Sequence, residues 1–144
     1  MRVFIGGVMQ ASNYGKVLVD QSYRTRIAEA LLARWPETEV LDPYALHPRS
    51  VDYDDGQARA TLFGMMELAA RSDLLIAFVP TASMGTALEM YVAYESGVPV
   101  ITVSPLAENW VVKSLSRRVF PDIETFLVCL ASSQSLSVLA GAGG

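Results

Sequence analysis

The sequence contains little of what several classes of protein need. Among its 144 residues there are one cysteine and one histidine, and the formal net charge is −4. The lone Cys129 forms no internal disulfide, and these two residues supply no Cys/His cluster for zinc. An acidic chain is also a poor partner for a nucleic acid polymer, because binding many phosphates requires a basic surface. A small molecule is therefore the expected ligand, with no metal.

Long hydrophobic runs are missing as well. Although 51% of the residues are hydrophobic, no apolar stretch reaches the roughly 18 residues that span a bilayer. The first apolar segment is too short for a signal peptide. We therefore expect a cytoplasmic protein with no membrane partner, whose hydrophobic residues fill the core of one domain.

Short apolar runs alternate with helical patterns along the chain. The strand-like runs are RVFIGG, TEVLDPY, DLLIAFVP, VPVITVSP and a short RVF. Helical patterns cover residues 22–35, 57–72 and 86–96, and NWVVKSLS and IETFLVCLAS follow. This alternation predicts an α/β fold, a doubly wound parallel sheet of about five strands with helices on both faces.

The chain is expected to fold as one domain over residues 1–132. Residues 133–144 are rich in Ser, Gly and Ala, a composition that predicts a flexible C-terminal tail.

Ligands of such sheets bind beyond the carboxyl ends of the strands, so the sheet itself selects the candidate loops. These loops are residues 6–20, 42–56, 80–86 and 104–109. In the third loop, Ser83, Gly85 and Thr86 come where a strand ends and a helix begins. There the backbone N–H groups and the helix dipole favour an anion or a polar sugar edge. Gly6 and Gly7 end the first strand and allow close approach from the neighbouring side.

Glu89 follows this loop in the next helix, and its position fits two roles. In the first, Thr86-x-x-Glu89 is a capping box whose carboxylate bonds back to the amide at the start of the helix. In the second, the carboxylate faces a sugar held at the carboxyl edge of the sheet and attacks it, kept ionised by the helix N-terminus.

Other loop residues are weaker candidates. Tyr14, Tyr44 and Trp110 are aromatic side chains that either stack on a flat base or pack beneath a loop. His47 is expected to be a loop histidine without a partner. Asp73 precedes the third strand, at the end away from the ligand, and is expected to be structural.

Three segments together resemble the nucleoside 2-deoxyribosyltransferase family, which includes nucleotide N-glycosidases that release a base from a nucleoside monophosphate. They are FIGG, SDLLIAF and ASMGTALEMYVAYESGVPV, and the resemblance covers about residues 1 to 130. The Ser-x-Gly-x-x-x-Glu pattern, followed by Ala and Gly-x-Pro, is its most specific part.

The resemblance implies a flavodoxin-like sheet and a glutamate nucleophile, which falls on Glu89. That residue would attack the anomeric carbon of a nucleoside or nucleotide, expel the base and form a glycosyl-enzyme intermediate, without a cofactor. Ser83 and Gly85 match positions that hold the 5′ hydroxyl or phosphate in relatives. The resemblance also implies a homodimer or higher homo-oligomer, in which Ser116 and Arg118 of a neighbouring copy close the pocket.

The sequence departs from the family at two places. Relatives usually carry an aspartate, eight positions before Asp73, that handles the proton of the leaving base, and here that position is Met65. Asp52, Asp54 or Asp55 in the loop after the second strand are alternative proton donors, although Asp54 and Asp55 are equally suited to cap the next helix. In addition, VMQ stands where relatives that act on monophosphates often carry an arginine, which leaves nucleosides open as substrates.

Three other functional hypotheses remain. A nucleoside- or nucleotide-binding module that has lost catalysis would explain the methionine at position 65. The cytokinin-type phosphoribohydrolases use a Gly-x-Gly-Thr-x-x-Glu loop, but here Ser83 replaces its first glycine and the preceding Pro-Gly-Gly is absent. This last hypothesis ranks lower, and flavin-dependent electron transfer ranks below it.

Overall fold

The computed structural model describes residues 1–10 and 16–141, and five parallel strands form its single sheet. The strands are β1 (Arg2–Gly7), β2 (Glu39–Leu41), β3 (Leu74–Phe78), β4 (Val100–Val103) and β5 (Arg118–Phe120). Their order across the sheet is β2-β1-β3-β4-β5, and all four pairings are parallel. This is the flavodoxin-like order, so the predicted fold is confirmed.

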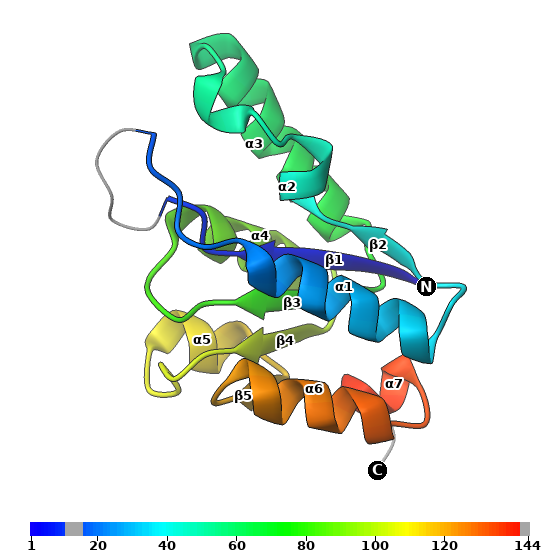
Figure 1. Cartoon of the computed structure of the whole chain (residues 1–144). Coiled ribbons are helices and arrows are strands. Elements are labelled where there is room, and N and C mark those ends of the chain that lie inside the picture. Colours follow the sequence, from blue (N-terminus) through cyan, green and yellow to red (C-terminus); the bar gives the residue numbers. More distant parts are fainter. Residues whose placement is uncertain (11–15, 142–144) are drawn as a thin grey trace.

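Helices cover both faces of the sheet (Figure 1). One face carries α1 (Ser22–Arg34) and α6 (Ile123–Ser132), and the other carries α3 (Asp55–Ala70), α4 (Met84–Glu95) and α5 (Trp110–Leu115). Each face has its own cluster of buried hydrophobic side chains. The central strands are buried on both sides, which explains why they read as continuous apolar runs.

Local sequence signals set the ends of these helices. The Asp54 side chain accepts a hydrogen bond from the backbone N–H of Gln57, and the Gln57 side chain accepts one from the backbone N–H of Asp54. This capping box starts α3 and confirms that Asp54 is a cap. Gly97 follows α4 with φ of 76°, the left-handed conformation predicted for it.

Three short elements were not predicted: α2 (Pro43–Leu46), the 3₁₀ helix η1 (Ser50–Asp52) and α7 (Leu136–Leu139). The last of these corrects the expected flexible tail. Leu136, Leu139 and Ala140 are buried in the same core cluster as α1 and α6. The Ser- and Gly-rich composition hid these apolar positions, whose burial fixes the chain at least as far as residue 140.

The segment from α2 to the first turns of α3 projects beyond the sheet (Figure 1). It stands above the carboxyl end of β1 and forms a wall beside the start of α4. Over residues 1–10 and 16–141, no helix has both the length and the apolar character needed to cross a membrane.

Candidate functional site

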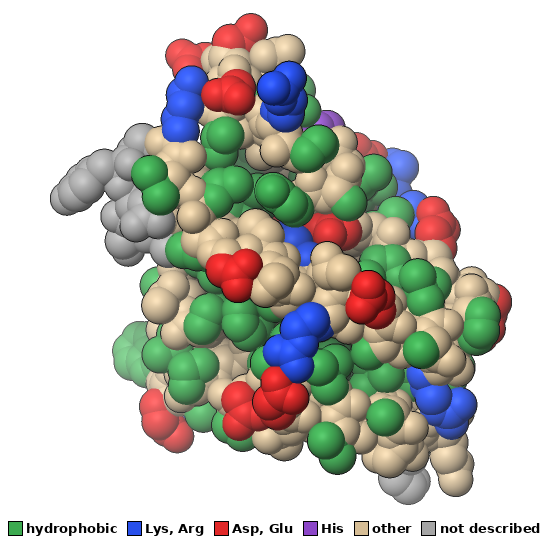
Figure 2. Space-filling view, viewed as in Figure 1, with side chains coloured by type: hydrophobic (Ala, Val, Ile, Leu, Met, Phe, Trp, Pro, Cys, Tyr) green, Lys and Arg blue, Asp and Glu red, His purple; other side chains and the backbone are tan. Residues whose placement is uncertain are grey.

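A cavity of about 380 Å³ lies at the carboxyl edge of the sheet, between the projecting segment and the start of α4. Its walls come from the loops after β1, β2 and β3, three of the four loops that the sequence selected, and from one face of α3. Figure 2 shows hydrophobic side chains along the recess between the projecting end and the body of the protein. The fourth loop contributes to a smaller, neighbouring cavity through Leu106 and Asn109.

The start of α4 brings Ser83, Gly85, Thr86 and Glu89 to this cavity, as the sequence suggested. Ser83 is the residue that caps the helix: its Oγ accepts a hydrogen bond from the backbone N–H of Thr86 at 3.3 Å. The hydroxyl of Ser83 also donates to Oγ1 of Thr86 at 2.8 Å. Because the cap is Ser83 and not Thr86, the capping-box interpretation of Glu89 is wrong.

Glu89 lies in the second turn of α4, with its side chain turned inward. It is only 8% exposed, and its Oε1 lies 3.3 Å from the point where a Cβ on Gly6 would stand. None of the described residues hydrogen-bonds to the carboxyl group. Burial raises the pKa of Glu89 to about 8, and the positive charge of Arg24 opposes this rise. The cavity is thus lined by a buried carboxyl group that has no hydrogen-bond partner among the described residues.

Arg24 forms part of the floor of the cavity and is 2% exposed. Its Nη1 donates to the carbonyl of Ile5 and to Oδ1 of Asp42, both at 3.0 Å, and its Nη2 donates to the carbonyl of Gly7 at 3.1 Å. The guanidinium therefore spans the end of β1 on either side of Gly6 and places a buried positive charge near Glu89.

Arg24 was not among the residues predicted from the sequence, although a signal for its burial was present. It lies three positions before Ile27 and seven before Leu31, and both of these are core residues of α1. That spacing places the arginine on the buried side of the helix. A charged residue on an apolar helical face thus indicated that Arg24 is buried and paired with an acidic side chain.

The two glycines that end β1 have different neighbours. Gly7 lines the cavity, and a Cβ there would collide with the Tyr23 ring, 2.7 Å from Cε2 and Cζ. Gly6 lies under the carboxyl group of Glu89 and is not itself part of the lining. The sequence predicted that a ligand approaches these glycines closely. In the structure protein side chains take that space: Tyr23 packs on Gly7 and Glu89 packs on Gly6.

His47 and Tyr53 line the cavity from the projecting segment. A hydrogen bond of 2.8 Å joins Nδ1 of His47 and the hydroxyl oxygen of Tyr53, and their rings meet edge to face at 88°. The expectation that His47 has no partner is wrong. The sequence offered little signal for this pair, because its geometry depends on the path of the chain through η1.

One face of α3 forms the cavity wall opposite His47 and Tyr53. It contributes side chains at helical spacing: Ala58, Thr61, Leu62 and Met65. Met65 therefore faces the cavity, and this is the position at which the resemblance implies an aspartate. A thioether there has no proton to donate.

The three aspartates considered as proton donors do not line the cavity. Oδ1 of Asp52 lies 3.4 Å from Nζ of Lys16 in an exposed ion pair. Asp54 caps α3, and Asp55 is exposed in its first turn. Helix capping and solvation account for all three, so these predicted donors are not brought to the site.

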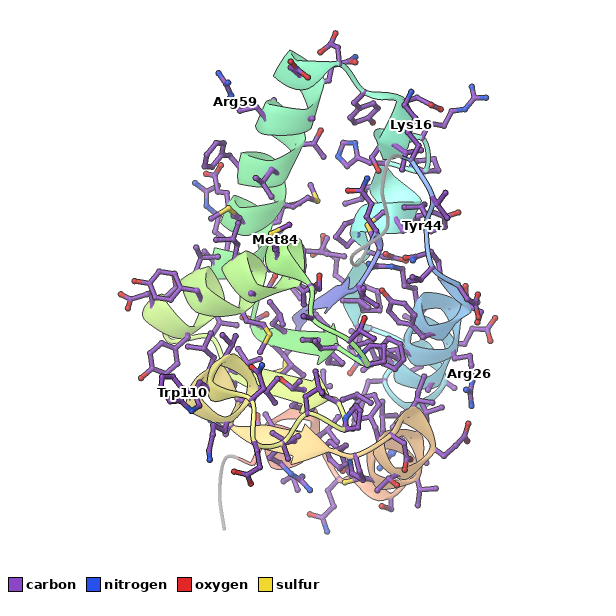
Figure 3. All side chains as sticks on the ribbon, turned by 90° about the vertical axis from the view of Figure 1, so that its left-hand side faces the viewer. Lys16, Arg26, Tyr44, Arg59, Met84 and Trp110 are labelled. Atoms are coloured by element: carbon purple, nitrogen blue, oxygen red, sulfur yellow. The ribbon has the colours of Figure 1, made fainter. Side chains whose placement is uncertain are left out.

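Two aromatic candidates also lie elsewhere. Tyr44 lines a second cavity on the outer side of α2, away from Met84 at the start of α4 (Figure 3). Trp110 is 84% exposed at the start of α5, so it neither lines the cavity nor packs beneath a loop. Tyr14 falls outside the described residues.

Ser116 and Arg118 lie away from the cavity and have partners within the chain. The hydroxyl oxygens of Ser116 and Thr102 are 2.6 Å apart, and Nη1 of Arg118 donates to the carbonyl of Leu139 at 3.0 Å. Arg118 thereby holds α7 against β5. The role of both residues toward a second copy of the chain stays a prediction.

The described residues contain no group of three or more His, Cys, Asp or Glu side chains arranged to hold a metal ion. Asp73 accepts a hydrogen bond from the backbone N–H of Arg2 at 2.7 Å, at the edge of the sheet opposite the cavity.

Comparison with known proteins gives a likeness in structure only. No protein-family model matches the chain, and no curated protein matches it by sequence. A 2-deoxyribosyltransferase from the psychrotolerant bacterium Bacillus psychrosaccharolyticus has a TM-score of 0.69 at 14% identity, with 96% of each chain covered. A conserved protein from Enterococcus faecalis has a TM-score of 0.62 at 19% identity, covering 89% of this chain and 95% of that one. A CMP N-glycosidase from Clostridium botulinum has a TM-score of 0.51 at 18% identity, covering 90% and 97%. At such low identities, these comparisons show that the chain has the fold of these proteins.

Proposed function

We propose that this protein cleaves the N-glycosidic bond of a nucleoside or nucleotide, with Glu89 as the nucleophile. The observation that carries the proposal is the placement of Glu89: a buried carboxyl group, without a hydrogen-bond partner among the described residues, at the inner end of a cavity. A group whose pKa is strongly perturbed in a cleft is a good candidate for catalysis. The shared fold with a 2-deoxyribosyltransferase and a CMP N-glycosidase supports the same chemistry.

The reaction would proceed through two displacements at the anomeric carbon. The ionised carboxylate of Glu89 attacks C1′ while the bond to the base breaks, and the electron pair of that bond leaves with the base nitrogen. Water or a second base then attacks the glycosyl-enzyme intermediate and releases Glu89. An adjacent carboxylate stabilises the oxocarbenium-like transition states of both steps, and neither step uses a redox cofactor.

The lining of the cavity supports an orientation for the substrate. The sugar is placed near Glu89 and the start of α4, where Ser83 and Thr86 are polar. The base is placed toward Leu62, Met65 and the projecting segment, since flat bases are held well by apolar walls with few polar groups.

The charges in the cavity favour a nucleoside over a monophosphate. Arg24 is the one cationic side chain among the described lining residues. Its Nε, Nη1 and Nη2 atoms already donate to protein oxygens, including the side chain of Gln21. A phosphate would therefore find no uncommitted positive side chain there, whereas a 5′ hydroxyl needs only a hydrogen bond at the start of α4.

A panel of nucleosides and their 5′ monophosphates tests the proposal directly. Incubation with purified protein, followed by chromatography of free bases, is expected to show release from at least one nucleoside, with slower release from the matching monophosphate. No release from any member of the panel would overturn the assignment as an N-glycosidase. Adding a second free base to the reaction distinguishes transfer from hydrolysis, because only transfer yields a new nucleoside.

Met65 favours a second candidate, a nucleoside-binding module without turnover. A methionine occupies the cavity wall where the resemblance implies a proton-handling aspartate. In that case nucleosides would raise the melting temperature of the protein, since a ligand that binds only the folded state stabilises it, but no base would appear. The same panel, read by thermal shift, separates the two functions.

A methyl group at Gly85 is expected to obstruct the ligand without disturbing the fold. A Cβ built at Gly85 meets no atom within 4 Å, although the residue lines the cavity at the start of α4. For Gly85→Ala we expect unchanged or slightly higher stability, because alanine is the better helix former. The added methyl group should raise KM about tenfold, equivalent to ~1.4 kcal/mol of binding.

Gly64→Ala is the matched control. Gly64 also lies in a helix with no atom within 4 Å of its added Cβ, but it does not line the cavity. Equal KM values for the two variants would contradict the placement of the sugar beside Gly85.

A further inference from the structure

His47 and Tyr53 form a polar pair within a largely apolar part of the cavity wall. Both line the same cavity as Glu89, and their Nδ1 and hydroxyl oxygen lie 2.8 Å apart. Their neighbours in this lining include Val51, Leu62 and Met65. A polar pair among such residues faces the part of the cavity in which the base is placed.

The backbone holds this pair in position. The N–H of His47 donates to the carbonyl of Pro43 at 2.8 Å, which closes α2. The carbonyl of His47 accepts from the N–H of Ser50 at 3.2 Å, and the carbonyl of Ser50 accepts from the N–H of Tyr53 at 3.1 Å. The bond to Tyr53 occupies Nδ1 and orients the ring, and no described residue is bonded to Nε2. The free ring nitrogen is thus available to a ligand.

The proposed reaction needs a proton donor at the base. When the bond from C1′ to a neutral base breaks, the base nitrogen takes the electron pair and leaves well only if a proton reaches the base. The side chains near the base supply few donors: Met65 has none, and the aspartates of the loop lie outside the cavity. An arginine side chain does not release a proton in proteins, which excludes Arg24 as the donor, and Glu89 is the attacking group. Histidine, the side chain that most often performs general acid catalysis, is present in this wall.

We propose that His47 protonates the leaving base and that Tyr53 is the positioning residue that orients its ring. The proposal rests on the glycosidase function proposed above. In the first step, a carboxylate oxygen of Glu89 bonds to C1′, the bond from C1′ to the base breaks, and the imidazolium of His47 passes its Nε2 proton to the base and becomes a neutral imidazole. In the second step, water attacks C1′, its proton returns to Nε2, and the carboxylate of Glu89 is released. Each step balances, and the enzyme returns to its starting state.

A change of leaving group separates this role from a structural one. A purine methylated at N7 carries a positive charge and leaves as a neutral base without protonation, so its release needs no acid. The variants His47→Asn and Tyr53→Phe are compared with wild type on 2′-deoxyguanosine and on 7-methyl-2′-deoxyguanosine. If the protein acts on pyrimidines, thymidine is compared with 5-fluoro-2′-deoxyuridine, whose base leaves more readily as an anion.

For His47→Asn, kcat on the unmodified nucleoside is expected to fall about 10²- to 10⁴-fold, the usual contribution of a general acid. On the methylated nucleoside the fall should stay below about tenfold, since no proton transfer is lost. Tyr53→Phe should show the same selectivity with a smaller loss. Tyr94→Phe, which removes a hydroxyl from an exposed tyrosine on α4, is the control and should match wild type on both substrates.

The possible outcomes are distinct. Equal losses of His47→Asn on both nucleosides, or no loss on either, would overturn the role of His47. If His47→Asn fails to fold, Tyr53→Phe decides in the same way, because it retains the ring. If wild-type protein releases no base from either nucleoside, the glycosidase function itself fails. Activity that is lost in Glu89→Gln but insensitive to His47→Asn would uphold the function and reject this inference alone.

Discussion

Glu89→Gln is expected to lose base release by at least about 10³-fold while the protein remains folded, as happens when a catalytic nucleophile is removed. Glutamine has nearly the same shape and stays uncharged, so it fits the inward position at the second turn of α4 without leaving a cavity. It cannot form the glycosyl ester, because an amide is a poor nucleophile. Single-turnover assays with the best substrate of the panel measure the loss.

Glu95→Gln is the matched control for this variant. Glu95 ends the same helix but is exposed, and it does not line the cavity. Its activity should equal that of wild type. If Glu89→Gln retained most of the wild-type rate, another group would have to be the nucleophile and the proposed function would lose its central residue.

The same substitution should also change how stability depends on pH. Burial raises the pKa of Glu89 from 4.5 to about 8 in the folded protein, so between these values the folded state binds more protons than the unfolded state. The free energy of unfolding of wild type therefore contains a contribution that is present below pH 4.5 and is lost as the pH rises through about 8.

Glu89→Gln lacks this contribution, so its stability relative to wild type should increase as the pH rises from 4.5 to about 8. At ~1.4 kcal/mol for each pKa unit, the gain over wild type at high pH is on the order of 3–5 kcal/mol. Urea denaturation between pH 4 and 9 measures it. A difference between the two proteins that does not change with pH would mean that the carboxyl group titrates as it does in water.

The second large effect is expected for Arg24→Met, which should lower the free energy of unfolding by about 3–5 kcal/mol, the cost of breaking a buried ion pair. The methionine fills much of the space of the arginine stem. It leaves the Asp42 carboxylate without its partner and the carbonyls of Ile5 and Gly7 without their donors. Chemical denaturation at neutral pH measures the loss.

Arg26→Met controls for the loss of a positive charge from the same helix. Arg26 is paired with Glu124, and its side chain is 44% exposed. Exposed ion pairs contribute little, so this variant should lose less than about 1 kcal/mol. Similar losses for Arg24→Met and Arg26→Met would contradict a structural role for the buried guanidinium.

Arg24 should also affect catalysis through Glu89. Its charge lowers the pKa of that carboxyl group, against the effect of burial. Since the nucleophile must be ionised, kcat/KM of wild type is expected to have a limb that rises with pH and has its midpoint at about 8. In Arg24→Met the rise should move to higher pH. An unchanged midpoint would mean that the two side chains are not coupled during the reaction.

Much of the architecture could be predicted from the local pattern of apolar residues and helix caps in the sequence. IETFLVCLAS predicted a helix whose bounds the structure reproduces as Ile123–Ser132, and DLLIAFVP predicted the buried strand β3. Asp54 and Gly97 marked helix ends correctly, because capping depends on atoms only a few residues apart. The composition of residues 133–144 predicted a flexible tail and did not indicate α7. Burial of Leu136 and Leu139 in the core stabilises this helix, although most of its neighbours are small or polar.

The candidate site was predictable in part. Parallel strands bring their carboxyl ends to one edge, so the sequence alone located Ser83, Gly85, Thr86 and Glu89 at the ligand edge. It left open whether Glu89 caps its helix or faces a ligand. That choice depended on where α4 begins, and a helix starting at Met84 with Ser83 as its cap turns Glu89 into the cavity.

By itself, then, the sequence determined the alternation of strands and helices and the edge of the sheet at which the candidate site lies, since each follows from short-range periodicity or from the geometry of parallel strands. Only the tertiary structure decided that Arg24 is buried against Asp42, that His47 meets Tyr53, and that the aspartates at 52, 54 and 55 remain outside. These contacts depend on the path that the segment after β2 takes beyond the edge of the sheet. No local repeat encodes that path, because it is set by packing between parts of the chain that are distant in sequence.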